Sequence, residues 1–173
     1  MKMKNRHIIS GFLVSILVII GVVAPVSAYS LLFFNPSVVE SNPGEVPGID
    51  LIMEGCDAGI SGYSLYLTLD NPSVASFGEI TFPSWVSMNK VEHINSTTVL
   101  IQGADLGNQV EAAISVANLA KISIHALTAG YATLGVQPVV IDDDHSGRYA
   151  PISKTASIVI SGAGPSPMIP ASK

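Results

Sequence analysis

The feature that most constrains the fold of this 173-residue chain is an alternating segment at residues 59–72. Its odd positions from 63 to 69 carry large apolar side chains, and its even positions carry Ser64, Tyr66 and Thr68. A period of two is typical of a strand with one face in a core and the other toward solvent. Asn71-Pro72 ends the segment, because proline cannot donate to a sheet ladder. We therefore expect one two-faced strand here.

The remaining chain repeats this pattern of short extended runs. Turn residues recur about every ten positions, a spacing typical of an all-β sandwich. The other strands we expect lie at residues 31–34, 49–53, 74–77, 80–82, 86–94, 97–102, 131–141 and 156–160. Pro138, inside one of them, indicates an edge strand or a bulge.

Residues 108–121 fit two structures. Small and apolar side chains at 110, 112–114, 117 and 120 suit an amphipathic helix that Asn108 would cap. The alternative is a strand at 110–116, a turn at Asn118 and a second strand at 119–127. Alternation around Ile122 and Ile124 supports a strand in the second half. For the first half, residues 108–118, we favour the strand over the helix.

The first 28 residues have the pattern of a secretory signal peptide. A basic start precedes the apolar run 8–23, and Val26-Ser27-Ala28 offers a small-residue cleavage site. The run is shorter than the roughly 20 residues that span a bilayer, which favours a cleaved signal over a retained anchor. We expect a signal at 1–28, a β-sandwich domain at 29–161, and a proline- and glycine-rich linker or tail at 162–173. The domain would be secreted or displayed on the cell surface.

The charge of the exported part is acidic. Removing residues 1–28 leaves five basic and thirteen acidic residues, a formal net charge of −8. Such a surface repels phosphate backbones, so nucleic acid is not expected as a partner. Cys56 is the one cysteine, so no intrachain disulfide forms, and we expect this thiol to be a small buried side chain.

The order of several turns resembles that of cohesin domains. The features are Gly59-Ile60-x-Gly62 before the alternating strand, the Asp70-Asn71-Pro72 corner, residues 119–122, the Ala129-Gly130-Tyr131 turn and the closing strand 156–160. Together they cover roughly residues 47–161. The resemblance implies a nine-stranded jelly-roll sandwich, not an enzyme, that binds dockerin modules in extracellular, polysaccharide-degrading assemblies.

By position, the resemblance places the partner-binding face on the outward side of the alternating strand, at Gly62, Ser64, Tyr66 and Thr68. Larger amide and carboxylate side chains are common in the family at the positions of Gly62 and Ser64. Two other functions stay open, a carbohydrate-binding module and a structural surface or adhesion domain. The fold is also similar to carbohydrate-binding sandwiches, although a flat aromatic row is not expected because Tyr63 and Trp85 suit a core.

Residues 142–147, Asp-Asp-Asp-His-Ser-Gly, resemble the start of a calcium loop. Oxygen ligands at Asp142, Asp144 and Ser146 with glycine next would fold the chain around Ca²⁺. The closing glutamate is missing, because Ser153 stands at the twelfth position, so a solvated acidic turn is the favoured interpretation and calcium a hypothesis. No other cofactor is expected.

Two further patterns complete the sequence. Asn95-Ser96-Thr97 is an N-glycosylation sequon and predicts a surface turn in an exported protein. No nucleophile elbow, HExxH helix or phosphate-binding glycine loop occurs in the chain. The residues therefore favour a binding module over an enzyme.

Overall fold

The computed structural model describes residues 29–162. The expected signal, 1–28, and nearly all of the expected tail lie outside these residues. Eleven strands and no helix are found in the described range. No helix within it is therefore long and apolar enough to cross a bilayer.

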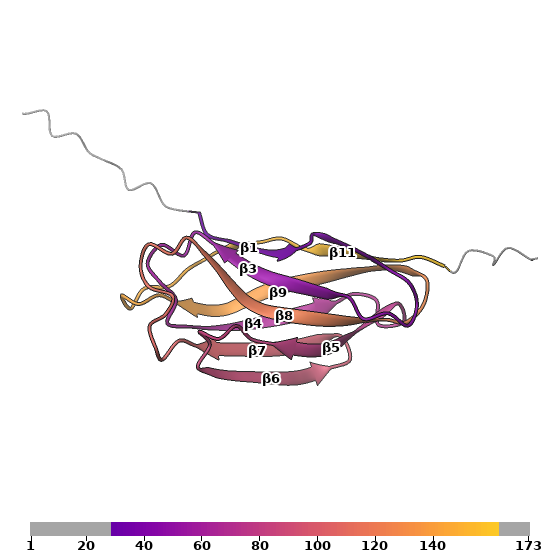
Figure 1. Cartoon of the computed structure of the whole chain (residues 1–173), viewed down its shortest axis with the longest axis horizontal. Helices are drawn as coiled ribbons and strands as arrows, with labels where there is room; N and C mark the ends of the chain where they lie inside the picture. The colour runs from indigo at the N-terminus through magenta and orange to yellow at the C-terminus, as the bar shows by residue number, and fades with distance from the viewer. Residues whose placement is uncertain (1–28, 163–173) are drawn as a thin grey trace, which may run out of the picture.

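The strands form two sheets that face one another, and the two ends of the described domain lie at opposite ends of its long axis (Figure 1). The five-stranded sheet has the order β10 (Ile152–Ser153), β1 (Leu31–Asn35), β3 (Gly48–Glu54), β8 (Val116–Ala126) and β5 (Ala75–Thr81). The six-stranded sheet has the order β2 (Val38–Ser41), β11 (Ala156–Ile160), β9 (Gly130–Asp142), β4 (Gly62–Leu69), β7 (Thr98–Ala104) and β6 (Met88–Asn95). The predicted all-β sandwich is confirmed.

In each sheet, a strand from the beginning of the domain pairs with a strand from its end. β1 pairs in parallel with β10, and β2 pairs in parallel with β11. All other strand pairs are antiparallel. The sandwich is therefore completed only when residues near its two ends meet.

The core lies between the sheets and is built by alternation. Leu65 and Leu67 of β4 are fully buried, while Tyr66 between them faces the other way and is half-buried. Tyr63 is 4% exposed, and its ring meets that of the half-buried Trp85 edge-on at 6.1 Å between centroids. Cys56 is also fully buried, as expected. The strand at 59–72 is thus central to both sheet and core.

Residues 108–118 differ from both sequence interpretations. The chain from 106 to 115 is an irregular loop, and β8 begins only at Val116. Asn108 and Ala113 have positive φ, which breaks helix and strand alike. The backbone N–H groups of Gln109 and Val110 donate to the Asp105 carboxylate instead of to a ladder. Asn118 lies inside β8 beside a bulge, so the predicted turn there is wrong.

Three further points concern the number and the positions of the strands. The runs at 74–77 and 80–82 form one strand, β5, with a register shift between Phe77 and Ile80. β9 is internal, pairing with β4 and β11, and its register shift beside Pro138 shows that the bulge interpretation was the right one. The short strands β2 and β10 were missed, so the count is eleven strands, not nine.

Candidate functional site

The outward surface of β9, β4, β7 and β6 is the candidate site, and we call it the outer face. Residues at even positions of β4 point onto it, opposite to the buried side chains of the same strand. Ser64 lies there between Gln102 of β7 and Val140 of β9, and Tyr66 lies between Leu100 and Gln137. The strand expected to carry recognition is therefore flanked on both sides by other strands.

The four predicted partner-binding residues form one row along β4, with unequal exposure. Thr68 is exposed, Gly62 and Tyr66 are half-buried, and Ser64 is only 8% exposed. Ser64 is nevertheless hydrogen-bonded, because the Gln102 side-chain amide donates to its hydroxyl at 3.4 Å. A docked partner would meet Tyr66 and Thr68 first and would reach Ser64 together with Gln102.

Gln102, Leu100 and Gln137 were not identified from the sequence. Each of them follows the same alternation as β4, but their place beside Ser64 and Tyr66 depends on which strands pair. That pairing joins residues 38 positions apart, as in Ser64 and Gln102, and no local pattern reveals it. Alternation alone could have shown that these three side chains point outward, but it could not have shown which residues lie beside them.

Two exposed apolar side chains frame the polar centre of the outer face. Val139 is 58% exposed at the β9 bulge, where Pro138 pairs with Leu65 and Val140 with Ser64. Met88 is 62% exposed at the start of β6. The outer face thus combines hydroxyl and amide groups in the middle with exposed apolar groups at its sides.

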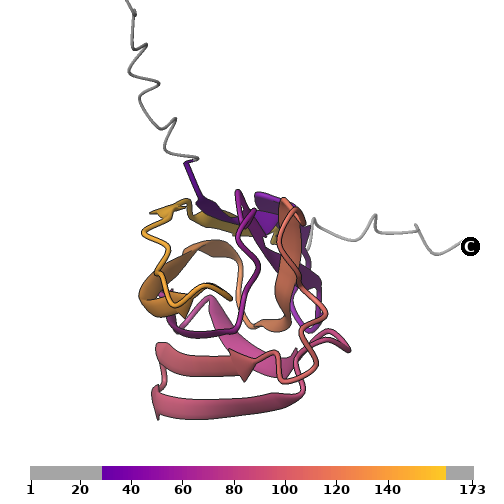
Figure 2. The ribbon, with the colours of Figure 1, turned by 90° about the vertical axis from the view of Figure 1, so that its left-hand side faces the viewer.

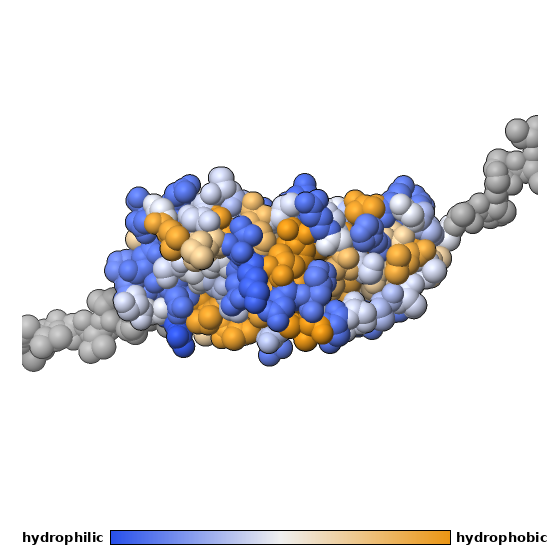
Figure 3. All heavy atoms as spheres, turned by 90° about the horizontal axis from the view of Figure 1, so that it is seen from below, coloured by the Kyte–Doolittle hydropathy of each residue, from blue (hydrophilic) through white to orange (hydrophobic). Residues whose placement is uncertain are grey.

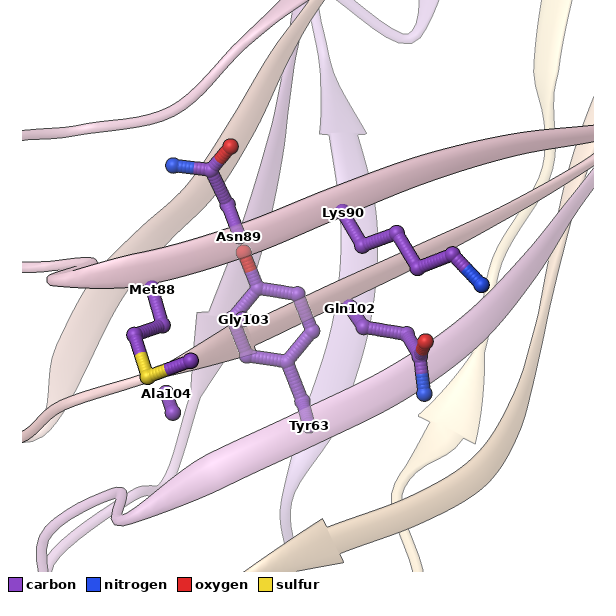
Figure 4. A pocket seen from close by; sticks show the side chains of 7 residues that line it. All are labelled: Tyr63, Met88, Asn89, Lys90, Gln102, Gly103 and Ala104. Atoms are coloured by element: carbon purple, nitrogen blue, oxygen red, sulfur yellow. The ribbon is translucent and has the colours of Figure 1, made fainter.

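A shallow pocket of about 320 Å³ lies where β6 and β7 meet β4 (Figure 4). The Tyr63 ring lies against Gly103, where an added Cβ would come within 2.5 Å of the ring. The Tyr63 hydroxyl donates to the Leu119 carbonyl at 2.6 Å, which ties β4 to β8 of the other sheet. Burial raises the pKa of the Tyr63 phenol. This tyrosine is therefore a core residue and not part of a sugar-binding surface.

The other tyrosines do not form a flat aromatic row either. Tyr131 is 76% exposed on β9, whereas Tyr66 is half-buried on β4. Tyr149 bridges two backbone groups, accepting from Ala58 N–H and donating to Gly59 C=O. These side chains are spread over separate parts of the molecule.

The acidic loop after β9 is organised by its own hydrogen bonds. Asp143 Oδ1 accepts from the N–H groups of His145 and Gly147, each at 2.7 Å. Asp142 pairs with Arg148 at 2.9 Å, and Ser146 has a φ of 66°. Within residues 29–162, no group of three or more His, Cys, Asp or Glu side chains is arranged to hold a metal. Calcium at Asp142, Asp144 and Ser146 stays a prediction, which titration calorimetry at millimolar calcium tests.

Asp105 is a buried carboxylate that the sequence did not single out. It is 8% exposed, and it accepts from the N–H groups of Gly107, Gln109 and Val110 at 3.1, 2.6 and 2.7 Å. Partial burial and the charge of Asp105 raise the pKa of Asp144 nearby. Its bonds within the loop give Asp105 a structural role.

Asn95 lies in the hairpin that joins β6 to β7 and is exposed. Its side-chain oxygen accepts from the backbone N–H and the hydroxyl of Thr97, at 2.8 and 2.9 Å. Glycosylation at Asn95 stays a prediction.

Comparison with known proteins gives a result for structure but not for sequence. No family model matches the sequence, and no curated protein matches it significantly. Among solved structures, the sixth cohesin of scaffoldin B from Acetivibrio cellulolyticus, in complex with a Cel5 dockerin, is 13% identical with a TM-score of 0.65. The match covers 77% of this chain and 99% of that one.

Two further cohesins are similar. The seventh ScaB type I cohesin of Pseudobacteroides cellulosolvens is 10% identical, with a TM-score of 0.64 over 79% of this chain and 95% of that one. A non-cellulosomal cohesin from the archaeon Archaeoglobus fulgidus is 16% identical, with a TM-score of 0.60 over 76% and 92%. This chain has the cohesin fold, which confirms the resemblance found in residues 47–161.

Proposed function

We propose that this chain is a cohesin-like binding module that docks a dockerin-bearing protein on its outer face. The observation that carries the proposal is the fold itself, since several of the similar cohesins are bound to dockerins. The composition of the outer face supports it. A polar row of Ser64, Tyr66 and Thr68 lies between the apolar Val139 and Met88, so apolar burial would supply affinity and hydrogen bonds would fix the orientation.

We further propose an extracellular setting, in an assembly that can include polysaccharide-degrading partners. The signal-like residues 1–28 support export, and the acidic charge of the remaining chain disfavours nucleic acid. The role is binding rather than catalysis. The side chains of the β4 row offer only hydroxyl groups for hydrogen bonding, so we expect the partner to reach that row with longer polar groups.

The direct test is a binding measurement with a panel of purified dockerins, each with calcium and with a chelator. The double variant Tyr66→Ala, Ser64→Arg should lower the affinity of any dockerin that binds by about 100-fold or more, because it removes a central ring and places a buried charge beneath the partner. Ser123→Arg, on the outward side of β8 in the other sheet, is the matched control and should leave affinity unchanged.

The two possible failures have different meanings. If no dockerin binds in either condition, the proposed partner class is wrong. If a dockerin binds and the Tyr66→Ala, Ser64→Arg variant binds it equally well, the partner class holds and the outer face is the wrong surface.

A further inference from the structure

Strand β6 is the most exposed strand of the six-stranded sheet. Seven of its eight residues are exposed and Val91 is half-buried. It forms the edge of the sheet beyond β7, and in the described part of the chain no strand pairs with its other side. Figures 1 and 2 show β6 at the lower rim of the molecule, and Figure 3, seen from that side, shows apolar and hydrophilic patches side by side. An edge strand of this kind can pair with another chain.

The sequence of β6 complements itself when it is read antiparallel. With Val91 facing Val91 of a second copy, Lys90 lies directly opposite Glu92 of that copy, and Glu92 opposite Lys90. Ile94 lies at the register shift between His93 and Asn95, so the argument rests on residues 88–93. Directly opposed residues point to the same face of a sheet, so the two ion pairs meet side by side. Residues 88–93 pair regularly with β7, so the segment that carries the charges is regular strand.

We propose that two copies of this chain associate through antiparallel β6–β6 pairing, with the two-fold axis at Val91. Alternate peptide groups of an edge strand point away from the sheet, so pairing gives them hydrogen-bond partners. Lys90 and Glu92 already contact one another within one copy, at 2.6 Å and with 60% and 47% of their side chains exposed. Pairing lets each meet an opposite charge of the second copy as well.

The same two charges select this register over its neighbours. A symmetric pairing shifts in steps that keep each side chain on its face. The register centred on residue 90 places Lys90 against Lys90, and the one centred on residue 92 places Glu92 against Glu92. Like charges directly opposite one another destabilise a sheet. The register centred on Val91 is therefore the one of the three in which every charged pair is attractive.

The pairing has a consequence for the outer face. Met88, Lys90 and Glu92 share that face with Gln102 and Leu100 of β7. Since paired residues keep the same face, the two outer faces of a dimer lie on one side of a continuous sheet that runs through both copies. Two partners joined by a linker could then bind together, which raises apparent affinity without any new contact.

Sedimentation velocity of the chain from residue 29 to residue 173 tests the association, with protein from about 5 μM to about 1 mM in low salt, where exposed charge pairs are strongest. We expect a concentration-dependent dimer. Lys90→Glu and Glu92→Lys should each raise its dissociation constant at least about tenfold, because each turns two attractive pairs into two repulsive ones. Glu40→Lys, an exposed charge on β2 at the opposite edge of the same sheet, is the matched control and should have little effect.

Mixing the two variants separates lost pairing from lost folding. In the mixture, both glutamates of the Lys90→Glu copy face both lysines of the Glu92→Lys copy, so a heterodimer should form more strongly than either homodimer. The double variant K90E/E92K should also regain self-association. A monomer at every concentration, a mixture that stays monomeric, or an equal loss in Glu40→Lys would overturn the proposal. Dockerin binding plays no part in this measurement, so the absence of a dimer would leave the proposed function standing.

Discussion

At the scale of single residues, Asp105 organises the loop from 106 to 115. Its carboxylate accepts three backbone N–H groups that no strand or helix would otherwise satisfy. Asp105→Ala should lower the free energy of unfolding by about 2–3 kcal/mol, since buried Val110 N–H loses its partner and charged acceptors bind strongly. Urea unfolding followed by circular dichroism measures the change. Asp57→Ala, an exposed aspartate, is the control and should stay within about 0.5 kcal/mol.

Tyr63 should make the folded protein less stable as the pH becomes alkaline. Burial raises its pKa in the folded state, whereas the unfolded phenol titrates near its usual value of about 10. The stabilisation is therefore fully present below pH 10 and is lost as pH rises above it, by up to about 1.4 kcal/mol per pH unit. Burial also raises the pKa values of Cys56 and Tyr149, so their effects have the same sign.

Tyr63→Phe isolates this contribution. At pH 7 the variant should be about 1 kcal/mol less stable, because the hydrogen bond to the Leu119 carbonyl is lost. Between about pH 9 and about pH 11 its stability should fall less steeply than that of the wild type, because the unfolded chain has one phenol fewer to ionise. Urea unfolding at each pH measures both slopes, and equal slopes would show that Tyr63 does not titrate on unfolding in this range.

At the scale of strands, the local sequence pattern predicts a strand correctly where one face of that strand is buried and the other is turned outward. β4 and β11 were predicted almost to the residue, because alternation and flanking turns are properties of the segment itself. The strand predicted at residues 110–116 is wrong, because the conformation of this segment follows from the Asp105 carboxylate and not from its own side chains. β2 was missed because its four residues are extended through parallel pairing with β11, far along the chain.

The candidate site shows the same division. The row of Ser64, Tyr66 and Thr68 follows from alternation, so the sequence could place these residues on one face. Gln102 and Gln137 become part of that surface through strand order, which is set by tertiary pairing. Asp142 and Asp144 stand near one another in the sequence, yet Asp142 pairs with Arg148 in the folded loop. Spacing alone could not reveal that partner.

The bulge in β9 gives a prediction about a single element. Pro138 and Val140 pair with adjacent residues of β4, so Val139 is the extra residue. Deleting Val139 would leave the register on both sides unchanged, and the fold should be retained with a melting temperature within about 5 °C. The affinity for the partner of the outer face should fall, because an apolar side chain that is 58% exposed is removed. Thermal melts and binding isotherms of the same sample separate the two effects.

Deleting Ala132 is the contrasting change. It removes a buried residue from a regular part of the same strand and shifts every following side chain to the opposite face. This variant should fail to fold cooperatively. If both deletions melt alike, the bulge does not absorb the missing residue as the register implies.

At the scale of the whole molecule, the sandwich depends on its last strand. β11 lies between β2 and β9, and it buries Ala156, Ile158 and Ile160 completely or nearly so. Burying one isoleucine contributes about 1.5–3 kcal/mol, and a domain of this size is stable by only about 5–15 kcal/mol. Loss of β11 would also leave β2 without the strand with which it pairs.

A chain that ends at residue 155 should therefore lack a cooperative thermal transition, whereas one that ends at residue 162 should melt within about 3 °C of the chain that ends at 173. The difference arises because residues 156–160 complete the six-stranded sheet and the core of the described domain. Circular dichroism melts of the three chains, each beginning at residue 29, make the comparison. A sharp transition in the shortest chain would mean that β2 and β9 can close the sheet without β11, contrary to the pairing that joins the two ends of this domain.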